Sequence, residues 1–444
     1  MNQNQKKNKA LKHQLKRARS EEKRKQKSEY SPILHKKQLL ARKIDDRIIE
    51  NHSFPLMTLL KKNHFFSNTQ FNTEFKIPKE FSISKDFTAN MRLISSIIYS
   101  VFTNSDISIK IKLNFYNCTY TDFPTLFFLK ILLTELKNNL NSINKRLSIL
   151  EYGINIEIID SKSSGVNRKL FGLGLIKDLK MPKNELQPKS KFDFEVGHKQ
   201  KKHYAENQKA KIATGIREYL NECLSNHGVV LNVRGNNRLD GIITEILNNA
   251  EDHSTTNKWY ISANYYQDEE KEFTGEFNLC FMNLGDSIYE GFEKTKKLNS
   301  ETYSKVNEFY EYMQKKTGKT FSRESLFTLY ILQDNISRLI YERESGGTGT
   351  MKFINSFYEL GNYVNQERGY HPVLSIHSGN TRILCDNTVK PIKDGNSYYI
   401  ALNQESNMSN PPSQKNLFSL NTTFPGTLLF AKMFINRSFL IRSE

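Results

Sequence analysis

The stretch EILNNAEDHS, residues 245–254, decides how this sequence is interpreted, because an apolar stripe and a row of polar side chains share it. Apolar residues recur at helical spacing over residues 239–250 and predict one amphipathic helix with a continuous packing face. At about 100° per residue, Glu245, Asn249 and Asp252 lie within roughly 60° of one another beside that stripe. The helix can therefore present a carboxylate and an amide at the rim of whatever it covers. The alternative interpretation is a solvated polar face.

Length and composition indicate a large globular protein. A chain of 444 residues is long enough for two or three domains. It contains no apolar run of the roughly eighteen residues that a membrane span needs, and its basic N-terminus has no apolar signal segment. Its four cysteines are scattered, so they predict neither a disulfide framework nor a zinc site. We therefore expect a cytoplasmic protein with reduced thiols.

The net charge of +18 is concentrated at one end of the chain. Residues 1–43 hold fifteen lysines and arginines and three glutamates, a net charge of +12. This arm could contact nucleic acid, acidic protein or anionic lipid through its charge. It has no interleaved aromatic residue before Tyr30, so the sequence does not predict base stacking, and a solubilising arm is an equally good interpretation.

The sequence divides into three regions. Residues 1–75 form the basic arm and a partly helical continuation. Residues 76–190 alternate strands with helices, which predicts a small α/β layer domain. Its strands are expected at residues 75–83, 107–115 and 154–160, its helices at 86–102, 124–140 and 166–179, and a polar linker at 180–202.

The third region, residues 200–444, is expected to be an α+β domain in which helices cover a mixed sheet. Helical sequence comes first, at residues 205–226 and then in the helix described above. A long insert of helical pattern, residues 287–345, interrupts the strands that follow. These strands are expected at residues 258–266, 275–283, 372–378, 381–386, 397–402 and 426–433.

Three glycine-containing segments follow the helix at restricted positions. NLGDSI (283–288) ends an expected strand, SGGTGT (345–350) precedes an amphipathic helix, and FPGTLLF (424–430) opens a strand. A glycine-rich loop at a helix N-terminus directs several backbone N–H groups to one point and supports an anion there. Each segment alone is weak evidence, because glycine runs are usually turns. The order of the helix and the three segments along the chain is much stronger evidence, because few families share it.

In that order, the helix and the three segments resemble the ATP-binding domain of the GHKL superfamily, which is shared by sensor histidine kinases, DNA gyrase B subunits, MutL proteins and anti-sigma serine kinases. The resemblance covers residues 205–434, and EILNNAEDHS is similar to the N box of that family. It implies a Bergerat-type α/β sandwich that binds ATP with Mg²⁺. It also implies that the insert stands where the family has its ATP lid, although a fixed helical hairpin is the alternative.

The resemblance gives a role to each matching residue. Asn249 would bind Mg²⁺, a hard cation that takes amide and phosphate oxygens and water. Glu245 would orient or deprotonate the water that attacks the γ-phosphate. Thr427 would lie near the adenine, and the loop 346–349 would line the phosphates. The positions expected at the nucleotide are Asn249, Asp252, Asn283, Gly285, Ser287, Gly346, Gly347, Thr348, Gly349 and Thr427.

The sequence departs from the family in its first glycine motif, Asp-x-Gly-x-Gly. Asn283 stands in place of the aspartate that accepts a hydrogen bond from the adenine amino group, and Ser287 in place of the last glycine. An asparagine can still accept through its carbonyl oxygen, but the bond loses its charge assistance.

The region at residues 76–190 resembles the STAS-like domains found beside such ATPases. LNFYNCTYTDFPTLFFL (113–129) follows their strand–turn–helix pattern. Regulatory members carry a phosphorylatable serine just after the residue that matches Asp122, whereas Phe123 and Pro124 follow here. The sequence therefore does not predict a phosphorylation switch at this position.

Three functions remain open from the sequence. The first is an ATP-dependent switch, an ATPase of the GHKL class if it hydrolyses ATP, in a bacterial regulatory or defence setting and with a protein partner or a second copy. The second is a protein kinase that acts on a partner in trans, since the chain has no phosphoacceptor helix. The third is a non-catalytic adaptor whose residues 1–43 bind nucleic acid.

Overall fold

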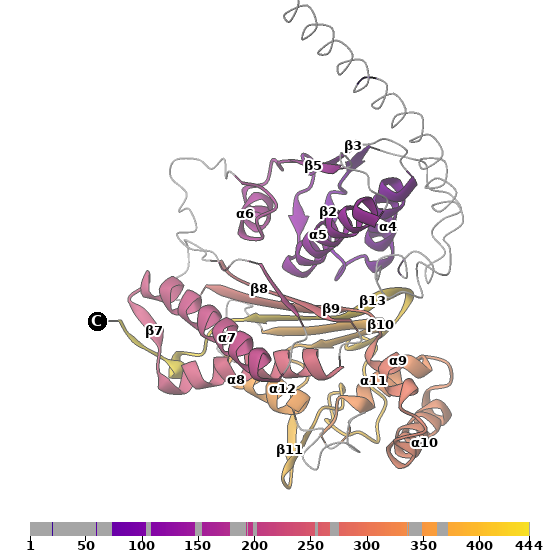
Figure 1. The fold of residues 1–444 in the computed structure, drawn as a ribbon. Coiled ribbons are helices and arrows are strands. Elements are labelled where there is room, and N and C mark those ends of the chain that lie inside the picture. The colour runs from indigo at the N-terminus through magenta and orange to yellow at the C-terminus, as the bar shows by residue number, and fades with distance from the viewer. Residues whose placement is uncertain are drawn as a thin grey trace, which may run out of the picture.

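The computed structural model shows a layered protein in which helices flank a central sheet (Figure 1). It describes residues 20, 59, 73–103, 108–146, 153–177, 192, 194–198, 202–253, 256–266, 275–334, 336, 349–361 and 372–443. The basic arm at residues 1–43 therefore lies almost wholly outside the described residues, as does the loop 346–348. Within the described ranges, no helix combines the length and apolarity needed to cross a bilayer.

The N-terminal layer confirms the predicted alternation of strands and helices. Its three-stranded sheet has the order β1-β3-β5, and both pairings are parallel. The stretch 75–83, expected to be one strand, is two short ones interrupted around Pro78, which has no N–H to donate to a ladder. The elements are β1 (Glu74–Lys76), β2 (Glu80–Phe81), α4 (Phe87–Thr103), β3 (Ser108–Asn114), β4 (Tyr120–Thr121), α5 (Phe123–Arg146), β5 (Gly153–Ile159) and α6 (Ser164–Gly172).

The large sheet has the strand order β10-β13-β9-β8-β6. All four of its strand pairings are antiparallel, so the prediction of a mixed sheet was wrong. Strand direction depends on how distant segments pair, which local alternation of apolar residues does not reveal. The strands are β6 (Glu195–His198), β8 (Lys258–Tyr266), β9 (Glu276–Leu284), β10 (Val373–Cys385) and β13 (Leu417–Met433).

The predicted linker at residues 180–202 contains the edge strand of the large sheet. β6 pairs with β8, and Gly197 stands opposite Trp259. A Cβ at Gly197 would lie 1.9 Å from the Trp259 ring, so glycine leaves the space that the indole occupies. The third region therefore includes β6 and begins before the predicted boundary at residue 200.

Three helices cover one face of the large sheet, as expected. The apolar stripe of α8 over residues 239–250 is buried along its whole length. The covering helices are α7 (Lys202–Ser225), α8 (Val233–His253) and α12 (Gly349–Gly361). Two short strand pairs and one 3-10 helix complete this side. The pairs are β7 (Val229–Leu231) with β14 (Leu440–Arg442) and β11 (Ile392–Asp394) with β12 (Ser397–Tyr399), and the 3-10 helix is η2 (Arg437–Phe439).

The N-terminal layer covers the opposite face of the same sheet (Figure 1). Apolar residues of α4 and α5 share one buried cluster with Tyr260, Met282 and Leu428 from the sheet. The Lys258 ammonium lies 2.9 Å from a carboxylate oxygen of Glu135 on α5, which adds an ion pair to this contact. The two regions predicted as separate domains thus pack through a common core.

The insert forms three helices, α9 (Ile288–Lys294), α10 (Ser300–Thr317) and α11 (Arg323–Ile331), which confirms its helical pattern. Hydrogen bonds join it to the sheet and to the C-terminal loops: the Asn380 amide donates to Glu324 at 3.0 Å, and the Ile400 amide donates to Gln333 at 2.9 Å. Of the two interpretations of the insert, a mobile lid or a fixed helical hairpin, these bonds favour the fixed hairpin for residues 288–333.

Candidate functional site

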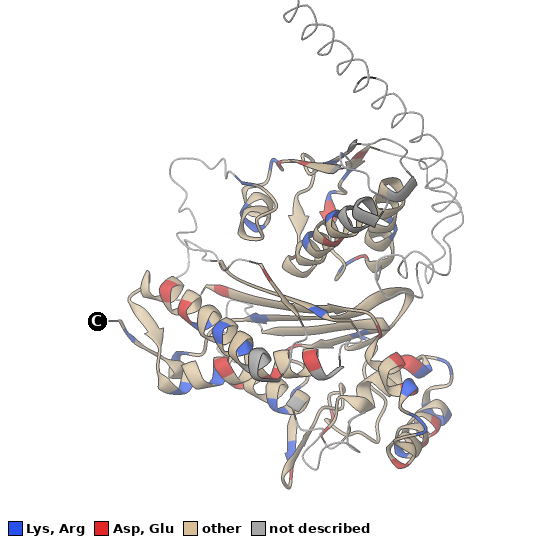
Figure 2. Ribbon diagram, in the orientation of Figure 1, with Lys and Arg blue, Asp and Glu red and all other residues tan. Residues whose placement is uncertain are grey.

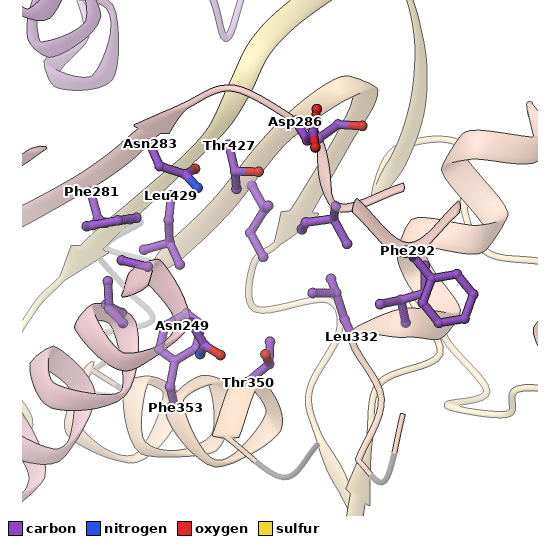
Figure 3. Close-up of a pocket in the computed structure, with 16 residues that line it drawn as sticks. Asn249, Phe281, Asn283, Asp286, Phe292, Leu332, Thr350, Phe353, Thr427 and Leu429 are labelled. Carbon is purple, nitrogen blue, oxygen red and sulfur yellow. The ribbon is translucent and has the colours of Figure 1, made fainter. Parts of the chain in front are cut away.

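A cavity of about 130 Å³ lies between α8, α12, the large sheet and the insert (Figure 3). One water molecule needs only about 10–15 Å³ by the same measure, so this space accepts a group as large as a heterocyclic ring. Most of its wall is apolar, as ligand pockets usually are. The lining residues are Ile246, Asn249, Ala250, Phe281, Asn283, Asp286, Ser287, Ile288, Phe292, Ile331, Leu332, Thr350, Phe353, Ile376, Thr427 and Leu429.

Four of the predicted nucleotide residues meet in this cavity. Asn249 comes from α8, Asn283 from β9, Ser287 from the start of α9, and Thr427 from β13. Figure 3 shows Asn283 and Thr427 side by side on the sheet, with Asn249 across the cavity on its helix. Segments far apart in the sequence therefore come together as the sequence predicts.

Asn283 supplies an unpaired hydrogen-bond acceptor at the sheet wall. The residue is only 7% exposed, and no described group bonds to its Oδ1 atom. Buried amide oxygens are nearly always paired, so this one can accept a hydrogen bond from a water molecule or a ligand group in the cavity. The prediction placed Asn283 at the end of a strand, and it lies near the end of β9, where it faces Thr427 as its partner on β13.

A hydrogen-bond chain fixes the hydroxyl of Thr427. Its Oγ1 atom lies 2.8 Å from the Oγ of Ser378 on β10, and the Ile288 amide donates to that Oγ at 2.8 Å. Three elements that line the cavity, β13, β10 and α9, are thus tied at one point. Because Ser378 already accepts from Ile288, its own hydrogen is available to Thr427, which can then donate into the cavity.

Gly426 is required by the close approach of two strands. Its φ is +124°, and a Cβ there would lie 2.1 Å from the carbonyl oxygen of Asn283. Both the backbone conformation and the available space therefore exclude a side chain. The predicted strand start at this glycine is instead the middle of β13, where the pairing with β10 shifts register.

Asn249 and Glu245 stand one turn apart on α8. The Asn249 amide donates to Glu245 Oε1 at 3.4 Å, and both side chains are partly exposed. Asn249 lines the cavity, whereas Glu245 does not and lies just outside it. This arrangement gives an amide in the cavity wall and a carboxylate one helical turn away from it.

Ser287 has a structural role that the sequence analysis did not assign. Its hydroxyl accepts from the Glu290 amide at 3.1 Å, and Glu290 accepts from the Ser287 amide at 2.9 Å. This capping box begins α9 and satisfies two backbone donors. Asp286, next to it on the wall, pairs with Lys294 at 2.5 Å. Both polar groups therefore hold the start of α9 at the cavity edge.

The remaining predicted residues are not brought into the described wall. Gly285, with φ +127°, turns the chain after β9 and is not among the lining residues. Gly349 is the first residue of α12, and Asp252 lies in the last turn of α8. Gly346, Gly347 and Thr348 lie outside the described residues.

The insert contributes wall residues that the sequence analysis missed. Phe292 and Leu332 lie at the end of the cavity opposite Asn283 (Figure 3), and Ile331 also lines the cavity. In the sequence they look like ordinary core residues of an amphipathic hairpin, and no local pattern distinguishes them. Thr350, directly after the glycine loop, also lines the cavity, and its position beside Gly349 could have identified it.

Charges are mixed over the described surface. Figure 2 shows lysine and arginine interspersed with aspartate and glutamate on the helices, without a continuous basic face in this view. In the described ranges no cluster of three or more His, Cys, Asp or Glu side chains could hold a metal ion.

Comparison with known protein families, curated proteins and solved structures finds no match for the chain.

Proposed function

We propose that the cavity binds ATP with Mg²⁺, as in the GHKL proteins that the motifs resemble, and that the chain acts as a nucleotide-dependent switch. The observation that carries this proposal is the meeting of Asn249, Asn283 and Thr427 around one cavity, with the Asn283 oxygen unpaired. A 6-aminopurine offers a donor for that oxygen and an acceptor for a hydroxyl donor beside it.

The residues present fit such a ligand. The apolar wall, which includes Phe281, Ile288 and Phe353, suits the faces of a purine, and the positive end of α12 suits phosphate groups. Asn249 would be the protein ligand of Mg²⁺, because that ion takes few protein groups and completes its shell with phosphate oxygens and water. A dedicated acidic cluster is not needed for this binding mode.

The packing of the N-terminal layer supports a switch. Alternate residues of β9 face opposite sides: Phe281 and Asn283 line the cavity, whereas Met282 belongs to the core shared with α4 and α5. A ligand that shifts β9 therefore acts on both cores at once. The N-terminal layer is the part of the molecule placed to pass that change to a partner.

Nucleotide binding is tested by thermal unfolding of the full chain with ATP, ADP or GTP, each with and without Mg²⁺. Ligand at about one hundred times its Kd adds roughly 2.7 kcal/mol of stability. Asn283→Leu is expected to remove the stabilisation by ATP, and Asn249→Ala to remove its dependence on Mg²⁺. Asn237→Ala changes an exposed asparagine of the same helix and serves as the control. Equal stabilisation of all four proteins would exclude this cavity as the binding site.

Hydrolysis is a separate question, tested through Glu245. Its carboxylate lies one turn from Asn249 and would orient or deprotonate a water bound beside that residue. We expect Glu245→Gln to keep ATP binding and to lose phosphate release. Turnover at the wild-type rate in this variant would show that Glu245 is not the base. Transfer from γ-labelled ATP to an added protein would instead favour the kinase alternative.

A further inference from the structure

The outer edge of the small parallel sheet has a feature that the proposed function does not use. β5 is the terminal strand in the order β1-β3-β5 and, within the residues described, pairs only with β3 (Figure 1). Its seven residues, GINIEII, include one charged residue and neither lysine nor proline. Proteins usually protect an edge strand by shortening it or by adding lysine or proline, and β5 has none of these features.

The backbone groups at that edge belong to three isoleucines. The Phe115 amide donates to the Ile159 carbonyl at 3.0 Å, so Ile159 directs its backbone groups toward β3. Backbone groups alternate sides along a strand, and therefore Ile154, Ile156 and Ile158 direct theirs away from β3.

The side chains of β5 divide into an apolar and a polar face. Ile154, Ile156 and Ile158 are half-buried and pack against the core of the N-terminal layer. Asn155 and Glu157 are exposed on the other face of the sheet. A strand added to this edge must keep its own apolar residues on the core side to continue the sheet.

A second copy of β5 meets all these conditions. Antiparallel pairing about a two-fold axis through Ile156 sets Ile154 of one copy against Ile158 of the other, and Asn155 against Glu157. The three isoleucine pairs are then the hydrogen-bonded ones, each exchanging two N–H···O bonds through the outward backbone groups. If the two-fold axis passed through Glu157, the Glu157 carboxylates of the two copies would face each other. Their repulsion disfavours that register.

We propose that the edge of β5 is a homodimer interface, in which two three-stranded sheets join into one continuous sheet of six strands. The interface is isologous, and the helices of both copies lie on the same side of the joined sheet. One strand pair is a small contact, so the association is expected to be weak and concentration-dependent.

Asn155 offers a test that separates assembly from folding. Within one chain it stands opposite Lys110 of β3, whereas across the interface it stands opposite Glu157 of the second copy. A glutamate at this position would attract Lys110 within the chain and repel Glu157 of the second copy. A lysine would repel Lys110 within the chain and attract Glu157 of the second copy. Because the two-fold axis repeats each pair, we expect the dimer Kd to rise roughly two- to thirty-fold in Asn155→Glu and to fall by a similar factor in Asn155→Lys.

Sedimentation velocity of the full chain without nucleotide, from about 1 to 200 µM, measures these constants independently of ATP binding. Ile156→Pro, which removes an N–H that faces the partner and not β3, is expected to abolish the dimer. The melting temperature of Asn155→Glu should not fall below that of the wild type. A wild-type chain that stays monomeric over this range, or a dimer whose Kd is the same in both Asn155 variants, would overturn the proposal.

Discussion

His377 makes the stability of the protein sensitive to acid, and the effect can be calculated from the structure. The side chain lies on β10 within the contact to the N-terminal layer, is fully buried, and has no hydrogen-bond partner at either ring nitrogen among the described residues. Its ring stacks on Phe87 at a centroid distance of 5.8 Å. Burial, and to a smaller extent the charge of Arg382, lowers the pKa of His377 to about 3.

The sign and size of the effect follow from linkage. The ordinary pKa of 6.5 applies in the unfolded chain. Between the two pKa values the unfolded chain binds a proton that the folded protein does not, so stability falls as pH falls below 6.5. At pH 5, which is 1.5 units lower, the loss from this one residue is about 2 kcal/mol at 1.36 kcal/mol per unit. The loss at pH 5 is the same for any folded pKa below about 4.

The assay is urea unfolding at pH 8 and at pH 5, followed by fluorescence of Trp259, the single tryptophan of the sequence, which is buried on β8 of the same sheet. His377→Leu keeps an apolar side chain of similar volume and cannot titrate. We expect the stability difference between the two pH values to be about 2 kcal/mol smaller in this variant than in the wild type. His198→Gln alters an exposed histidine of β6 and should leave the difference unchanged. Equal pH dependence in His377→Leu and wild type would refute the burial of a neutral histidine.

Three further predictions concern a glycine of the large sheet, a glycine of α8 and the ion pair between the sheet and the N-terminal layer. Gly426→Ala should cost at least about 1 kcal/mol, because φ is +124° and the Cβ would lie 2.1 Å from a backbone oxygen. Gly241→Ala, in the exposed middle of α8 with no atom within 4 Å of the added Cβ, should stabilise the protein by about 0.5–1 kcal/mol, and urea unfolding measures both glycine variants. Lys258→Met should destabilise by up to about 3 kcal/mol, because it leaves the Glu135 carboxylate, 4% exposed, without its cation. The double variant with Glu135→Leu should recover most of that loss in urea unfolding, and additive losses would contradict a direct pairing.

The spacing of apolar residues predicted where helices and strands lie better than it predicted which of them pair or pack together. The α8 stripe is buried as predicted, because helical spacing is set within a few turns of one segment. The strand β6 was missed because EVGH has little apolar alternation, and its pairing depends on the space that Gly197 leaves for Trp259. Likewise, residues 372–378 and 381–386 were predicted as two strands, but they form β10, which continues through a bulge at Gly379.

The candidate site was predictable where polar residues stand beside a recognisable pattern, as Asn249 does beside the apolar stripe of its helix and Asn283 and Thr427 do beside glycines. It was not predictable where apolar residues form the wall. Phe292 and Leu332 belong to the insert, and their place at the cavity follows only from how α11 is anchored to the sheet, as in the bond from the Asn380 amide to Glu324. Apolar side chains carry no local pattern that separates a pocket wall from a core.

The anchoring of the insert determines which part of the molecule could close over a nucleotide. Helices α9 and α11 are bonded to β10 at one end of the cavity, through the bond from the Ile288 amide to Ser378 and the bond from the Asn380 amide to Glu324. Movement of the two helices would break both bonds, and Ser378 in turn bonds Thr427 on the neighbouring strand. A shift of Thr427 also moves Leu428, its neighbour on β13, which lies in the core shared with the N-terminal layer. On the proposed function, the response to nucleotide therefore passes through the sheet to the N-terminal layer and not through a swinging lid of α9–α11.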